Sequence, residues 1–78
     1  MTIYDQTRKP EVPTGHVLVE MREYEYEPGW GASQRTDSWR SFETMDEAMK
    51  WCDDYNRRFN NEKETPNYYI KPMIYGLL

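Results

Sequence analysis

Between Thr44 and Asn60, apolar residues recur at the three- and four-residue spacing of an amphipathic helix. They are Met45, Ala48, Met49, Cys52, Tyr55 and Phe59. This spacing places them along one stripe of a helix with 3.6 residues per turn. Thr44 and Glu47 form the T-x-x-E pattern of a capping box, which satisfies free backbone N–H groups at a helix start. The pattern therefore predicts one helix that buries its apolar stripe.

Three other segments have the alternating or aromatic pattern of strands. They run from His16 to Glu27, from about Gln34 to Phe42, and from Tyr68 to Leu78. In the first segment Val17, Val19 and Met21 share one face, but the apolar residues after Met21 fall one position out of phase. Such a slip indicates either a β-bulge near Arg22–Glu23 or a central strand that is covered on both faces.

Turn residues and prolines predict the order of these strands. The turn PGWGAS, residues 28–33, joins the first two strands, because Pro and Gly supply the backbone angles of a tight reversal. The second strand is polar apart from Trp39 and Phe42, and Pro72 interrupts the third, so both are expected at sheet edges. Residues 16–78 are thus predicted to form an α+β domain of ββαβ order. Its three-stranded, mainly antiparallel sheet has the spatial order 2-1-3, and the helix packs on one face.

Residues 1–15 contain two prolines and a glycine among mostly polar neighbours. This composition is typical of a flexible N-terminal arm. Ile3 and Tyr4 are apolar side chains through which it could attach to the domain. Two alternatives therefore remain open, a disordered tail and an arm that adds a strand or docks on the domain.

Size and charge limit the classes of function. The chain has 78 residues and a net charge of −4. A domain of this size buries only about 60% of the surface that its unfolded chain exposes, which leaves little room for a deep active site. The negative charge argues against general affinity for nucleic-acid backbones or anionic membranes. No apolar run approaches the roughly 20 residues of a membrane span, and the N-terminus lacks the apolar core of a signal peptide, so a soluble cytoplasmic protein is expected.

The residues that usually carry chemistry are few. The chain has one cysteine and one histidine, which excludes an internal disulfide and leaves no set of zinc ligands. Cys52 lies in the apolar stripe of the helix, where it acts as a small hydrophobic residue. His16 has no evident catalytic partner, and PGWG lacks the spacing and the lysine of a phosphate-binding loop. We therefore expect no enzyme activity, no metal and no cofactor.

Aromatic residues are abundant, with three Trp, seven Tyr and two Phe. One helix covers one face of a small sheet, so several aromatic side chains remain for the other face, and exposed aromatic faces usually mark interfaces. The alternatives are tyrosines that lie half-exposed on a solvated sheet, or tyrosines covered by the N-terminal arm. Glu23, Glu25 and Glu27 add an acidic row with a spacing of about 6.8 Å, which is also what a simple solvated strand shows. The predicted partner-binding residues are Glu23, Tyr24, Glu25, Tyr26, Glu27, Trp30, Trp39, Tyr69 and Tyr75.

Three segments carry a resemblance to a known class of proteins. They are EYEYEPGWG at residues 23–31, SFETMDEAMKWCDDYN at residues 41–56, and PNYYI at residues 66–70. Together they resemble small, mostly uncharacterised accessory proteins of tailed bacteriophages that have an E-Y-E-P-G-W-G turn. The resemblance covers about residues 20–75. It implies a host-takeover protein, often a binder of a host protein, and it assigns no catalytic residue.

The leading hypothesis is a non-enzymatic protein that binds a host bacterial protein, as an inhibitor or modulator, in the cytoplasm of the host. Its aromatic face would supply the contacts, and its acidic row would steer it toward a basic surface. An alternative is a platform for single-stranded nucleic acid, with bases on Tyr24, Tyr69 or Trp39 and nearby arginines and Lys71 on phosphates. A further alternative is an acidic mimic of nucleic acid built on the glutamate row. A weak face-to-face homodimer would also cover the aromatic face.

Overall fold

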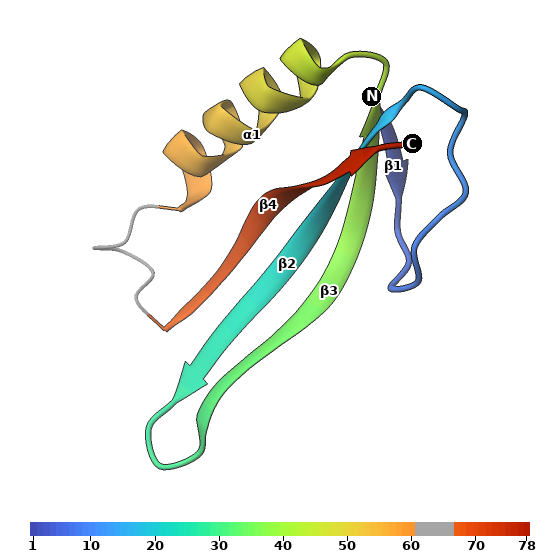
Figure 1. The fold of residues 1–78 in the computed structure, drawn as a ribbon. Helices are drawn as coiled ribbons and strands as arrows, with labels where there is room; N and C mark the ends of the chain where they lie inside the picture. Colours follow the sequence, from blue (N-terminus) through green and yellow to red (C-terminus); the bar gives the residue numbers. More distant parts are fainter. Residues whose placement is uncertain (61–66) are drawn as a thin grey trace.

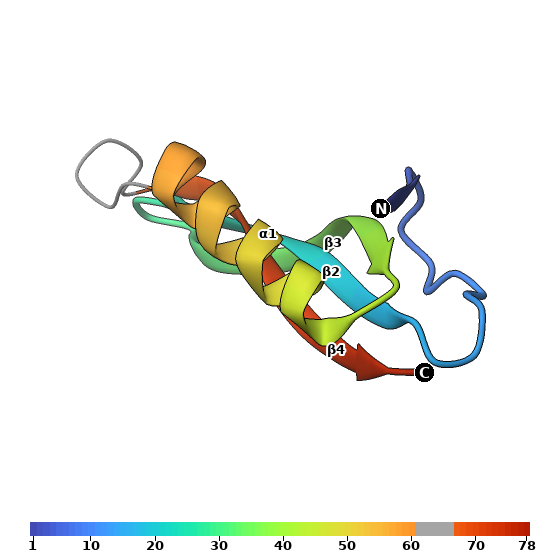
Figure 2. The same cartoon turned by 90° about the horizontal axis from the view of Figure 1, so that it is seen from above.

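The computed structural model of the chain describes residues 1–60 and 67–78. Along this part of the chain the elements are β1 (Thr2–Tyr4), β2 (Val17–Glu27), β3 (Gly31–Phe42), α1 (Met45–Phe59) and β4 (Tyr68–Leu77). The strands form one antiparallel sheet in the order β1-β3-β2-β4. Helix α1 and the segment between β1 and β2 lie on different sides of this sheet (Figures 1 and 2).

The α+β class and the single helix are as predicted, but the three-stranded sheet is wrong. The sheet has four strands, because β1 pairs with β3 from Thr2↔Ser41 to Tyr4↔Trp39. Two predicted positions hold, since β2 is central and β4 is an edge strand. The second predicted strand, β3, is not an edge where β1 pairs with it. A three-residue strand is too short to show a period, so its pairing with residues nearly forty positions away left no local signal.

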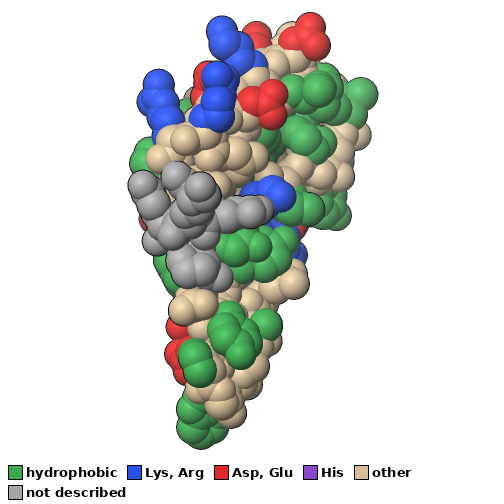
Figure 3. Space-filling view, turned by 90° about the vertical axis from the view of Figure 1, so that its left-hand side faces the viewer, with side chains coloured by type: hydrophobic (Ala, Val, Ile, Leu, Met, Phe, Trp, Pro, Cys, Tyr) green, Lys and Arg blue, Asp and Glu red, His purple; other side chains and the backbone are tan. Residues whose placement is uncertain are grey.

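Helix α1 begins where the capping pattern predicts. The Thr44 hydroxyl accepts a hydrogen bond from the Glu47 backbone N–H at 3.2 Å. Ala48 and Cys52 bury against the sheet and complete a core with β2 and β3, made of Val17, Val19, Met21, Phe42, Ala48 and Cys52. Met45, Met49 and Phe59, which the pattern placed in the buried stripe, remain 38%, 53% and 59% exposed. Only the middle of the stripe is buried, and hydrophobic side chains gather on the surface of the helix side (Figure 3).

Strand β2 is covered on both faces at Val17–Val19, as one of the two explanations for its irregular pattern expected, whereas Tyr26 near its other end is 50% exposed. Val17, Leu18 and Val19 are each 0% exposed, although consecutive side chains of a strand point to opposite faces. The register with β3 also shifts between Met21 and Arg22, close to the predicted β-bulge, but the irregularity lies in β3 and not in β2. There β3 contributes the extra residue Asp37. The alternation along β2 therefore continues from one end of the strand to the other.

Candidate binding surface on the sheet

The alternation along β2 separates Glu23, Glu25 and Glu27 from Tyr24 and Tyr26. Glu23 pairs with Ile70, which packs against the core under α1, so Glu23 and then Glu25 and Glu27 point to the helix side. Tyr24 and Tyr26 point to the opposite side, which we call the arm face. The predicted partner-binding residues are thus divided between two faces and do not form one surface.

The N-terminal arm closes the half of the arm face that lies next to β1. Leu18 and Trp39 are 0% and 4% exposed there. The Trp39 indole N–H donates to the Thr7 carbonyl oxygen at 3.4 Å. The ring of Tyr75 meets Trp39 edge-on with centroids 5.5 Å apart, and the Lys9 ammonium lies 5.1 Å from the Tyr75 ring centroid. Trp39 is therefore a core residue beneath the arm, as one alternative from the sequence allowed.

The other half of the arm face is not covered by the described part of the arm, and it carries the remaining tyrosines. Tyr24 and Tyr69 are opposite one another on β2 and β4, and their rings stack with centroids 4.9 Å apart and planes 19° apart. The Tyr24 hydroxyl donates to the Met73 sulfur at 3.8 Å. Tyr26 and Tyr75 are 50% and 52% exposed. We define Tyr24, Tyr26, Tyr69, Met73 and Tyr75 as the tyrosine surface.

A row of charged side chains crosses the tyrosine surface. Arg22 and Lys71 are register partners on β2 and β4, so they share this face. Arg22 donates to Glu20 at 3.1 Å and to the Gln34 side chain at 3.3 Å. The hydrogen bond and charge of Glu20 raise the pKa of Arg22 above its ordinary value. Lys71 is exposed, and among residues 1–60 and 67–78 it forms no ion pair.

The acidic row on the helix side is engaged within the fold at Glu23. Glu23 is buried, and its carboxylate accepts hydrogen bonds from Arg35 Nε at 2.5 Å and from the Tyr68 hydroxyl at 3.1 Å. The hydrogen bond from Arg35 lowers the pKa of Glu23. The neighbouring Glu27 side chain raises the pKa of Glu25. The fold therefore does not present Glu23, Glu25 and Glu27 as three independent, solvated carboxylates.

Trp30 stands apart from both faces. It is 88% exposed in the turn between β2 and β3, between Gly29 and Gly31, whose φ angles of 89° and 94° suit glycine. Its backbone N–H donates to the Glu27 carbonyl at 2.9 Å, which closes the turn. The turn predicted from PGWGAS is therefore present, with an exposed indole at the far end of the hairpin.

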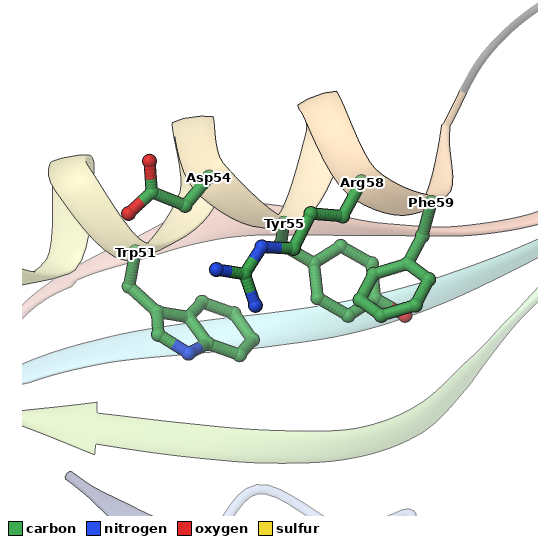
Figure 4. Close-up of a pocket in the computed structure, with 5 residues that line it drawn as sticks. All are labelled: Trp51, Asp54, Tyr55, Arg58 and Phe59. Atoms are coloured by element: carbon green, nitrogen blue, oxygen red, sulfur yellow. The ribbon is translucent and has the colours of Figure 1, made fainter.

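A groove beside α1 was not predicted as a site from the sequence. It has a volume of about 400 Å³ and is lined by Trp51, Asp54, Tyr55, Arg58 and Phe59 (Figure 4). The rings of Trp51, Tyr55 and Phe59 follow one another along the helix with centroids 5.3 Å and 4.7 Å apart. Their four-residue spacing is visible in the sequence, but the sequence analysis assigned only Tyr55 and Phe59 to the buried stripe and did not combine them with Trp51.

The one cysteine of the chain, Cys52, is buried on the helix side. Burial raises the pKa of the Cys52 thiol to about 11, so this side chain is a poor nucleophile. Within residues 1–60 and 67–78, no three His, Cys, Asp or Glu side chains gather as a metal site. No helix in the same part of the chain is long and apolar enough to cross a membrane.

Comparisons of the chain with protein-family models, with curated proteins and with solved structures gave no match.

Proposed function

We propose that the protein is a non-enzymatic binding protein that recognises a host bacterial protein through the tyrosine surface. The observation that carries this proposal is the group of aromatic side chains on the half of the arm face that the arm does not cover. A bacteriophage origin and a host-takeover role, as inhibitor or modulator in the host cytoplasm, are part of the proposal. They rest on the resemblance of the three sequence segments given above.

The chemistry of the tyrosine surface supports protein binding. Tyrosine is enriched among the residues that contribute most to binding energy. Its ring has few rotatable bonds, so little conformational entropy is lost when it is fixed in an interface. The stacking of Tyr24 on Tyr69 and the contact of Tyr75 with Trp39 already fix three of the rings before a partner arrives. The surface is therefore well ordered in the free protein.

One observation favours single-stranded nucleic acid as a second candidate partner. Glu23, Glu25 and Glu27 of β2 lie on the helix side, so they do not occupy the face on which Tyr24, Arg22 and Lys71 meet. Base stacking, however, needs a free ring face, and Tyr24 and Tyr69 each already use one face against the other. An acidic mimic of nucleic acid has less support, because Glu23 is engaged by Arg35 and Tyr68.

The test is capture of a partner from bacterial lysate, followed by titration calorimetry with the purified partner. The variant Tyr24→Ala/Tyr26→Ala is expected to lose the partner. Truncation of an aromatic residue at the centre of an interface typically costs about 2 kcal/mol or more in binding free energy. Met49→Ala is the matched control, since Met49 is as exposed as Tyr26 but lies on α1. Circular dichroism confirms that both variants are folded. Failure to recover a stoichiometric partner, or a partner retained by the double variant, would contradict the proposal.

A further inference from the structure

The charged side chains beside the tyrosine surface are mostly basic, whereas the net charge of the whole chain is negative. The chain has a net charge of −4. On the arm face, however, the charged strand residues are Arg22 and Lys71 on the basic side and Glu20 on the acidic side. The Glu20 side chain is 14% exposed and is engaged by Arg22 and by the Thr36 hydroxyl. The carboxylate on this face is therefore neutralised within the fold.

Two cations remain available on this face. Lys71 lies between Tyr69 and Met73 on β4, and Lys9 of the arm lies over the Tyr75 ring. In the part of the chain that the structure describes, neither lysine forms an ion pair. Lys71 and Tyr75 are four residues apart on β4, so the Lys9 ammonium over the Tyr75 ring lies further along this strand than Lys71. Lys71 is flanked on one side by the Tyr24–Tyr69 pair and on the other side by Met73.

From this arrangement we infer that the partner of the tyrosine surface presents an acidic, extended protein segment. Its carboxylates meet Lys71 and Lys9, and its apolar side chains contact Tyr69 and Met73. The inference rests on the proposed function and adds the chemistry of the partner. It also changes an expectation from the sequence, in which the glutamate row would steer the protein toward a basic surface, because those glutamates lie on the other side of the sheet.

A protein segment fits this surface better than a nucleic acid does. The two lysines lie among apolar side chains, and a peptide strand repeats its side chains every second residue at about 6.8 Å, so it can present both carboxylates and apolar side chains along β4. A nucleic acid would place a phosphate at every nucleotide and would need more than two free cations to bind firmly. The stacked pair of Tyr24 and Tyr69 also leaves only one face of each ring open.

The experiment is a titration of the intact, isotope-labelled protein. NMR measures the amide chemical shifts at each step of the titration. The probe is a short synthetic peptide of alternating glutamate and apolar residues, and the matched probe has glutamine in place of each glutamate. A third titration uses a thymidine oligonucleotide of similar length. The variants are Lys71→Gln and, as a control that removes the same charge, Lys50→Gln. Lys50 is exposed on α1, away from the tyrosine surface.

The acidic peptide is expected to shift the amides of Arg22, Tyr69, Lys71 and Met73, and the glutamine peptide is expected to shift them much less. Lys71→Gln should weaken the binding about two- to five-fold, the range of one partly exposed ion pair, and Lys50→Gln should leave it unchanged. Equal weakening by both variants, shifts confined to α1, no shifts, or a response only to the oligonucleotide would overturn the inference. The proposed function fails separately, when Tyr24→Ala/Tyr26→Ala retains the captured host protein.

Discussion

Removal of residues 1–13, so that the chain starts at Thr14, is expected to destabilise the fold strongly. The arm covers Leu18 and Trp39, which are 0% and 4% exposed in the intact protein. Full burial of a leucine side chain stabilises a fold by about 1.5–3 kcal/mol, and re-exposure of part of an indole adds a similar amount. The expected loss is therefore about 3–6 kcal/mol. This is a large share of the roughly 5–15 kcal/mol that stabilises a typical domain.

Urea unfolding, followed by the circular dichroism of α1, measures this loss. With a slope of roughly 1–3 kcal/mol per molar urea, the midpoint should fall by about 2 M. The control is Ile3→Ala, because Ile3 belongs to β1 but is 57% exposed, so its truncation should cost no more than about 0.5 kcal/mol. A truncated chain that unfolds at the midpoint of the intact protein would refute the packing of the arm on Leu18 and Trp39.

Light scattering on the intact protein and on the chain that starts at Thr14 tests the homodimer that the sequence predicts. In the intact protein, only the tyrosine surface of the arm face is available for pairing two copies. Truncation at Thr14 adds the area around Leu18 and Trp39, so the shortened chain should associate more strongly, because larger exposed apolar patches favour association. Stronger association of the intact chain would show that the arm itself contributes to pairing.

Three further predictions follow from single residues. Thr44→Ala removes the acceptor of the Glu47 N–H and should cost about 1 kcal/mol in a urea unfolding experiment, whereas Thr44→Ser should cost much less. The pKa of Glu23 is lowered from 4.5, so its stabilising effect is present above pH 4.5 and is lost as pH falls through the folded value. The stability difference between the wild type and Glu23→Gln should therefore shrink at acid pH, and a difference independent of pH would contradict this. The Cys52 thiol, with its pKa raised to about 11, should react with a disulfide reagent at pH 8 only after unfolding in urea, and rapid reaction of the folded protein would contradict its burial.

Local sequence signals predicted the elements that depend on local interactions. Thr44 and Glu47 marked the start of α1, and the glycines around Trp30 marked the turn between β2 and β3. The fourth strand was only an alternative for the arm and not part of the predicted sheet, because β1 exists through its pairing with β3 and nothing within three residues encodes that partner. The same pairing carries the arm across the face that contains Leu18. The burial of Leu18 thus depends on a distant segment, and no pattern around residue 18 could indicate what covers it.

The candidate site was predicted in part, and the errors have a physical cause. Tyr24, Tyr26 and Tyr69 do lie on the face opposite α1, as the sequence analysis expected. Trp39 lies on that face too, but the arm covers it. The glutamates were grouped with the tyrosines because they are adjacent in the sequence. A strand with a period of two sends adjacent residues to opposite faces, so the grouping could not survive once β2 was found to be regular.

The separation of charge across the sheet affects how an acidic partner would approach. At a distance the protein repels such a partner, because its net charge is −4. At an ionic strength of 0.15 M this repulsion is screened beyond about 8 Å, so the nearest charges, Lys71 and Lys9, dominate the final approach. Long-range steering is therefore weak for this surface, and the lysines contribute mainly to the stability and orientation of the docked complex. The tyrosines then provide most of the buried area, and the cations select which segment can lie across them.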